Sequence, residues 1–171
     1  YLKARNLQGV QMITSDAHKG LVASIKKSFT NVSWQRCQVH FLRNIFASIP
    51  KKDSVAFREQ VKALFKFTDI DIARKTKEKI AETYIDDRKY KTACTILDEG
   101  FEDAFQYITS GGRNSRLRST NLLERLNEEL RRREKIVRIF PNVSSANRLI
   151  GALLMDQSEQ WEYAARSYIK M

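Results

Sequence analysis

Cysteine and long hydrophobic runs are both scarce in this 171-residue sequence. Two cysteines, Cys37 and Cys94, are too few for a disulfide framework and are typical of a reducing compartment. No apolar run approaches the roughly 18 residues that a membrane-spanning helix needs, and the chain opens with no signal-peptide pattern. We therefore expect a soluble, intracellular protein with no membrane partner, whose 42% of hydrophobic residues suffice for a buried core.

Acidic residues are scarce in one place, the first 50 residues. Asp16 is the only acid there, against seven Lys and Arg residues. It follows the stretch 10–15, at the expected exposed end of a strand. Ordinary protein surface mixes both signs of charge, so a lone carboxylate among bases is better explained as a metal ligand beside bound phosphates. The alternative is an Asp that forms a turn or caps the next helix, and the pattern leaves both open.

The net charge of +11 is unevenly distributed along the chain. Residues 1–50 carry seven bases and one acid, and residues 111–140 carry nine bases and four acids. Residues 51–110 and 141–171 are neutral, with twelve and three charges of each sign. If folding brings the two basic segments together, they form a face suited to a polyanion. Anionic membrane is a weaker alternative, because no helix combines a basic face with a strongly apolar one.

The first 40 residues have the pattern of a strand, a helix and a second strand. Residues 9–14 and 32–38 are the expected strands, and apolar residues at helical spacing predict a helix over 18–29. Such a βαβ unit favours parallel strands. Ligands of parallel sheets gather at the carboxyl ends of the strands, where Asp16 lies.

The rest of the chain has helical periodicity throughout. One helix ends at Pro50, Asp53 and Asp69 are placed to cap the next two, and residues 90–108 supply one or two more. A loop over 110–119 is followed by a helix from Ser119 or Thr120 to about residue 133. We expect this helix to bury Leu123, Leu126 and Leu130, and two more helices to follow, a buried one over 146–154 and another over 161–168.

Four motifs, in this order and at this separation, resemble the mutator-type bacterial insertion-sequence transposases. These enzymes are ribonuclease H-like and use two aspartates and a glutamate. The resemblance covers most of the chain and is strongest at 9–50 and 116–155. The motifs are Ser-Asp-Ala-His-Lys-Gly-Leu at 15–21, Cys-Gln-Val-His at 37–40, Ser-Thr-Asn-Leu-Leu-Glu-Arg-Leu-Asn at 119–127, and Phe-Pro-Asn at 140–142.

The resemblance implies an α/β, mostly α chain with a partial ribonuclease H-like fold that an all-α insertion interrupts. Asp16 corresponds to the family's second catalytic aspartate and Glu124 to its glutamate, 108 residues later. The family places its first catalytic aspartate on an earlier strand, so we expect the C-terminal catalytic portion of a transposase. The expected parts are a partial core at 1–50, the insertion at 51–112, and the Glu-bearing helix with the C-terminal helices at 113–171.

The same resemblance implies two-metal phosphoryl transfer on double-stranded DNA. Asp16 and Glu124 would each hold a Mg²⁺ (or Mn²⁺) ion, and the intact enzyme would cleave transposon ends and join the freed 3′-hydroxyl to target DNA. We expect the present polypeptide alone to bind no ions and to cut nothing. The expected setting is a homodimer or larger assembly in the bacterial cytoplasm, associated with the nucleoid.

Several alternatives remain open at the predicted site. Glu128 and Glu129 share the helix of Glu124, and only the motif beginning at Thr120-Asn121 favours Glu124, with Asn121 in support. Cys37 and His40 match the family's Cys-x-x-His signature and are expected to support the carboxylates, although Cys37 could simply be a core residue. A zinc site would use Cys37, Cys94, His18 and His40, whose spacing matches no finger or ribbon.

Basic residues around the Glu-bearing helix have the composition for phosphate contacts. A solvated charge run is the alternative for any one of them, and for Arg131 it is an ion pair with Glu128. A non-catalytic DNA-binding module and another ribonuclease H-like nuclease are the competing functions. The predicted DNA contacts are Lys19, Arg113, Arg116, Arg118, Arg131, Arg132, Arg133 and Lys135.

Overall fold

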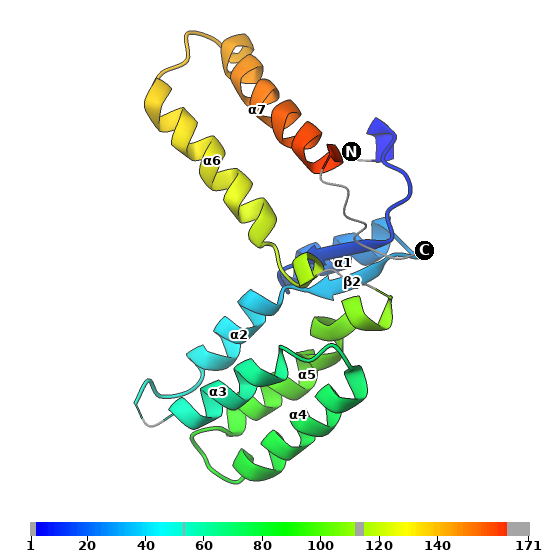
Figure 1. Ribbon diagram of the computed structural model, residues 1–171, viewed down its shortest axis with the longest axis vertical. Helices are drawn as coiled ribbons and strands as arrows, with labels where there is room; N and C mark the ends of the chain where they lie inside the picture. Colours follow the sequence, from blue (N-terminus) through cyan, green and yellow to red (C-terminus); the bar gives the residue numbers. More distant parts are fainter. Residues whose placement is uncertain (1–2, 53, 112–114, 164–171) are drawn as a thin grey trace. The chain divides into compact units, whose positions relative to one another are not determined.

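The computed structural model describes residues 3–52, 54–111 and 115–163, which form two units. The first unit, Tyr1–Thr120, contains the predicted strand–helix–strand unit followed by helices, and the second, Asn121–Tyr168, contains two helices (Figure 1). The first unit holds η1 (Lys3–Arg5), β1 (Met12–Ser15), α1 (Lys19–Ser28), β2 (Ser33–Arg36), α2 (Gln38–Ala47), α3 (Val55–Leu64), α4 (Ile70–Tyr84), α5 (Lys91–Thr109) and η2 (Ser115–Arg118).

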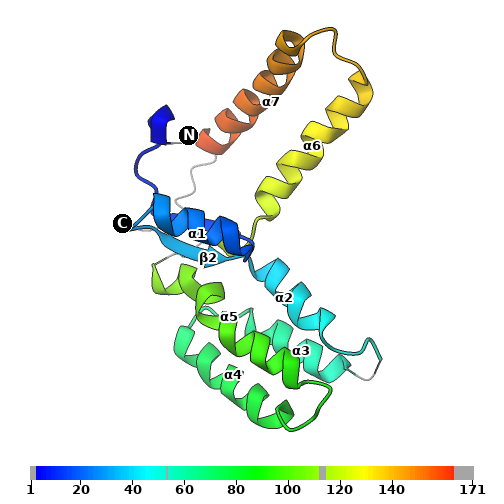
Figure 2. The same ribbon diagram turned by 180° about the vertical axis from the view of Figure 1, so that it is seen from behind.

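The two strands are parallel, as predicted, and Met12 pairs with Ser33 at one end and Ser15 with Arg36 at the other. Helix α1 lies along this small sheet (Figure 2). The second strand ends earlier than predicted, because Cys37 is the N-terminal cap of α2 and Gln38 its first residue. The α/β, mostly α class is therefore confirmed, whereas the ribonuclease H-like detail stays a prediction.

Helices α2 to α5 pack around one apolar core in the first unit. Phe101 and Phe105 stack with ring centroids 4.5 Å apart, and Phe41 meets Phe65 edge to face at 5.8 Å. Burying each such side chain stabilises the fold by about 1.5–3 kcal/mol. The most deeply buried large side chains are Phe41, Phe57, Phe101, Phe105, Ile45, Leu64 and Leu97.

Asp53 and Asp69 were predicted to cap two helices, and the structure describes only Asp69. Asp69 Oδ1 accepts hydrogen bonds from the backbone N–H groups of Asp71 (2.8 Å) and Ile72 (3.1 Å) and so caps α4. Asp53 is among the residues that the structure does not describe. The stretch 90–108, where one or two helices were expected, holds one helix, α5, with Tyr90 at its N-terminal cap.

Two glutamines connect the all-α region to the sheet. Gln35, on β2, is fully buried, and its Nε2 donates to the carbonyl oxygen of Ala104 while its Oε1 accepts from the N–H of Tyr107, both at 2.7 Å. Gln38 Nε2 donates to the same Ala104 oxygen at 2.7 Å. A polar side chain survives in this interior because its hydrogen-bonding groups are satisfied. We name these contacts the Gln35 clamp.

Gly100 allows α5 to approach the sheet and α2 closely. A Cβ at this position would lie 2.6 Å and 2.8 Å from ring atoms of Phe41 and would contact the guanidinium of Arg36. The Arg36 guanidinium itself stacks 4.2 Å above the Phe41 ring. Glycine is therefore required here by space rather than by an unusual backbone angle.

The second unit contains α6 (Asn121–Val137) and α7 (Val143–Tyr163). The prediction of two separate C-terminal helices was wrong up to residue 163, because α7 is continuous, and residues 164–168 lie outside the described chain. The predicted burial of Leu123, Leu126 and Leu130, and of the helix over 146–154, was also wrong: neither helix contains a buried residue. The two helices make few contacts with each other, so neither covers the apolar stripe of the other, and Leu123 remains 56% exposed.

Candidate active site

Asp16 lies directly beyond the carboxyl end of β1, as predicted, with an exposed side chain. Its Oδ1 accepts a long hydrogen bond of 3.4 Å from the backbone N–H of His18. His18, rather than Asp16, occupies the cap position of α1, and the His18 side chain makes no capping bond. Asp16 thus helps form the turn but does not cap the helix, and its carboxylate remains accessible to a ligand.

Cys37 connects this strand end to the start of the Glu-bearing helix. Its backbone N–H donates to the Ser15 carbonyl oxygen at 2.7 Å. Its fully buried Sγ accepts from the backbone N–H of Thr120 at 3.5 Å and lies 3.5 Å from the Thr120 hydroxyl. Ser15 immediately precedes Asp16, and Thr120 immediately precedes α6. We call these three residues, Ser15, Cys37 and Thr120, the Cys37 junction.

A second contact joins the same two segments. The hydroxyl of Thr14, on β1, donates to the carbonyl oxygen of Leu117, in η2, at 2.8 Å. His40 lies in the first turn of α2, three residues after Cys37, and is half-buried. The Cys-x-x-His motif therefore sits at the meeting point of β1, β2, α2 and the segment that leads into α6.

Glu124 and Asn121 both lie in the first turn of α6 and are exposed. A carboxylate in a first turn is favourably placed in the field of the helix N-terminus. The competing Glu129 is engaged elsewhere: it accepts from Arg132 (2.7 and 2.8 Å) and from Arg133 (2.9 Å). These hydrogen bonds lower the pKa of the Glu129 carboxyl to about 2. Glu128 is exposed on the same helix.

The predicted DNA-binding residues have different surroundings. Lys19 is the exposed first residue of α1, and Arg116 is exposed in η2. Arg118 is partly buried, because its Nη1 donates to the Phe65 carbonyl at 3.1 Å and its guanidinium lies 5.9 Å from the Tyr107 ring. Burial raises the pKa of Tyr107, and Arg118 partly opposes that rise. Arg113 lies outside the described residues, whereas Arg131, Arg132, Arg133 and Lys135 are exposed on α6.

The structure places each of the side chains that the sequence suggested as metal ligands. Within the described part of the chain, no group of three or more His, Cys, Asp and Glu side chains could hold a metal ion. Cys94 packs in the helical core, where burial raises the pKa of its thiol. Asp16 fits as one hard oxygen ligand, being exposed in a segment otherwise free of acids.

Among the residues that the structure describes, no helix is long and apolar enough to cross a membrane.

Comparison with known proteins decides the family. Residues 1–164 match the family described as Transposase, Mutator family. The chain belongs to the mutator family of transposases. The resemblance inferred from the four motifs is thereby confirmed.

Curated relatives of this mutator-family chain are transposases of insertion sequences. The chain is 66% identical over 169 residues to the transposase for element IS256 in transposon Tn4001 of Staphylococcus aureus, covering 99% of this chain and 43% of the relative. It is 38% identical over 171 residues to the ISRM5 transposase of Rhizobium meliloti, covering 99% and 42%. For the IS1081 transposase of Mycobacterium tuberculosis the identity is 34% over 161 residues, covering 94% and 38%. The chain thus spans about two-fifths of the length of these relatives.

Proposed function

We propose that this chain contributes Asp16 and Glu124 to the catalytic centre of a DNA transposase. Its relatives are named as transposases of insertion sequences, and both residues lie in the motifs that carry the family resemblance. The substrate is double-stranded DNA, first the ends of the element and then the target, in the cytoplasm of a bacterium. The excess of bases in residues 1–50 and 111–140 suits this polyanion.

The Cys37 junction is the observation that carries the proposal. Cys37 bonds both segments: its backbone N–H donates to Ser15, just before Asp16, and its buried sulfur accepts from Thr120, just before α6. Asp16 is one residue from Ser15, and Glu124 is four residues from Thr120. Two carboxylates that act on one pair of ions need fixed attachment points, because small displacements cost large factors in rate. A non-catalytic module has no such requirement.

The two carboxylates supply hard oxygen atoms of the kind that Mg²⁺ and Mn²⁺ prefer. When bound, a pair of such ions activates the attacking oxygen and stabilises the leaving oxygen of a phosphodiester. Asp16 and Glu124 would each hold one ion, and a third carboxylate would complete the ligand set. His40 supports the Asp16 end of the site, and Asn121 supports the Glu124 end.

As an isolated 171-residue polypeptide, we propose that the chain cleaves no DNA. The described residues offer no group of three metal-binding side chains, and two carboxylates alone hold Mg²⁺ weakly. Metal-dependent nicking by this polypeptide that disappears in Asp16→Ala would contradict this point.

A chimera tests the function directly. The matching segment of the Staphylococcus aureus transposase, 66% identical, is replaced by this chain and the excision and integration of the element are measured. We expect transposition in the chimera, and a loss of about 10³-fold or more in Asp16→Asn and in Glu124→Gln. Glu128→Gln, one turn further along α6, is the matched control and should retain activity. An inactive chimera, or active Asp16→Asn and Glu124→Gln variants, would contradict the proposal, and the second result would favour a DNA-binding module.

A further inference from the structure

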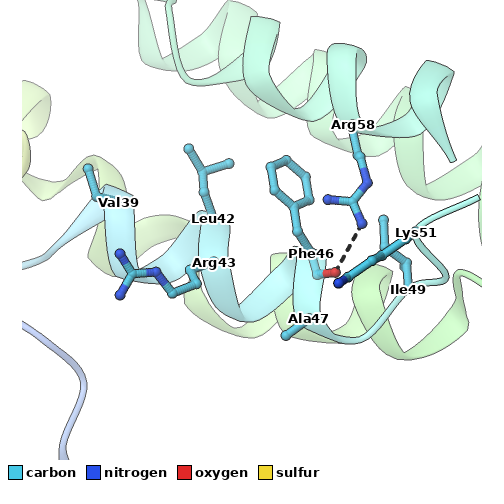
Figure 3. A pocket seen from close by; sticks show the side chains of 8 residues that line it. All are labelled: Val39, Leu42, Arg43, Phe46, Ala47, Ile49, Lys51 and Arg58. Atoms are coloured by element: carbon cyan, nitrogen blue, oxygen red, sulfur yellow. Dashed lines mark hydrogen bonds between the residues drawn. The ribbon is translucent and has the colours of Figure 1, made fainter.

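An open groove runs along the outer face of α2 and the start of α3 (Figure 3). Its volume is about 830 Å³. The residues that line it include no acid, and three of the eight are cationic. Those used below are Leu42, Phe46 and Ile49, which are apolar, and Arg43, Lys51 and Arg58, which are basic.

One of these cations is held in place. The Nη2 of Arg58 donates to the Phe46 carbonyl oxygen at 3.3 Å, as Figure 3 shows, and its Nε donates to the hydroxyl of Ser54 at 3.1 Å. The guanidinium also lies 4.9 Å from the centroid of the Phe46 ring. A guanidinium fixed in this way loses little freedom when it binds a carboxylate. The groove is therefore suited to an acidic segment that also carries apolar side chains.

The C-terminal part of α7, residues 149–163, has that composition. Residues 149–163 contain three acids and no base. Asp156, Glu159 and Glu162 recur every three residues and so share one face of the helix. They are exposed, and none takes part in the ion pairs found among residues 3–52, 54–111 and 115–163. Met155 and Tyr163 are 67% and 84% exposed beside them.

We propose that the groove on α2 and α3 receives the acidic face of α7 from a second copy of the chain. Opposite charges meet across this contact, and Met155 and Tyr163 supply apolar surface for Leu42 and Phe46. Exchange in both directions gives a symmetric dimer with two identical contacts. DNA fits the groove less well, because protein–DNA interfaces are strongly polar and five of the eight residues that line this groove are apolar.

Charge reversal on each side of the contact tests the proposal. One variant carries Arg43→Glu and Lys51→Glu, and the other carries Asp156→Lys and Glu159→Lys. Sedimentation equilibrium of the full chain should show a dimer whose dissociation constant rises about tenfold or more in either variant alone. An equimolar mixture of the two should dimerise again, because both contacts in the mixed dimer are complementary. The control is Lys75→Glu with Lys79→Glu on α4, which makes the same charge change on exposed residues outside the groove.

Each outcome decides for or against the exchange. Dimerisation that both variants lose and the mixture restores supports it. A wild-type chain that stays monomeric up to about 100 μM overturns it, since such a dimer would be weaker than specific interfaces of standard size. Variants that fail to rescue each other also overturn it, because both contacts in their mixed dimer are complementary. Loss of DNA binding without any change in dimerisation would assign the groove to DNA instead.

Discussion

The Sγ atom of Cys37 lies 3.5 Å from the backbone nitrogen and 3.5 Å from the hydroxyl oxygen of Thr120, 83 residues later. The same cysteine bonds through its own backbone to Ser15. The cysteine of the Cys-x-x-His motif thus joins two segments that each lead to a proposed catalytic carboxylate. These contacts account for the cysteine of the motif without a zinc ion.

Cys37→Ala should loosen the start of α6. The substitution removes the sulfur atom that accepts from the Thr120 N–H, which we expect to lower the free energy of unfolding by about 1 kcal/mol. Hydrogen exchange at the Thr120 amide should accelerate more than at amides of α4. Cys94→Ala is the matched control, because it removes the same atom from the helical core. Equal exchange at Thr120 in both variants would contradict the junction.

Gln35→Leu should weaken the contact between the all-α region and the sheet and so lower the free energy of unfolding. Its Oε1 is the acceptor of the Tyr107 N–H, so the substitution leaves a buried donor unpaired at a cost of about 1–3 kcal/mol. Gln38→Leu is the matched control, since the Ala104 carbonyl would keep its bond from Gln35. Urea denaturation should show the larger loss for Gln35→Leu. A larger loss of stability for Gln38→Leu would show that the Gln35 clamp does not connect the all-α region to the sheet.

Gly100→Ala should destabilise the chain, although alanine is normally the better helix former. The added Cβ would lie 2.6 Å from the buried Phe41 ring, and such overpacking costs about 1–3 kcal/mol. Gly151→Ala, on α7, meets nothing within 4 Å and should instead stabilise its helix by about 0.5–1 kcal/mol. Thermal unfolding of the two variants should therefore shift in opposite directions. Shifts of the same sign would mean that α5 can move away from Phe41.

Glu129 should titrate at unusually low pH. The hydrogen bonds from Arg132 and Arg133 lower its pKa from 4.5 to about 2. A lowered folded-state pKa gives stability that is present above pH 4.5 and lost as pH falls toward 2. Carbon-detected NMR of the side-chain carboxyl should show this titration, and Glu129→Gln should remove it together with the matching loss of α6 helicity. A Glu129 pKa near 4.5 would mean that Arg132 and Arg133 do not hold its carboxylate. Glu129 would then again be an alternative to Glu124 as the proposed metal ligand.

Local patterns were enough to predict much of the first unit. Apolar spacing located β1, α1 and β2 to within a few residues, because each of these short elements turns one side toward its neighbours. Asp69 was identified as a cap because its hydrogen bonds reach only two and three residues along the chain. The position of Asp16 at a strand end followed from the same βαβ pattern.

Contacts between distant segments could not be predicted from such patterns. The Cys37 junction and the Gln35 clamp join residues 83 and 72 positions apart, and periodicity carries no signal for either. The burial expected along α6 and α7 failed for a related reason. An apolar stripe shows that a helix has a face to cover, but it does not say whether a partner is present in the same chain.

The most direct test of the proposed metal site is a change of metal preference at Asp16. In the chimera, Asp16→Cys replaces a hard oxygen ligand with a thiolate, which binds Mn²⁺ better than Mg²⁺. Strand transfer by this variant should be absent with Mg²⁺ and restored with Mn²⁺, whereas the parent chimera works with both. Equal activity of Asp16→Cys in the two metals, or its failure in both while Asp16→Asn stays active, would contradict a metal-binding role for Asp16.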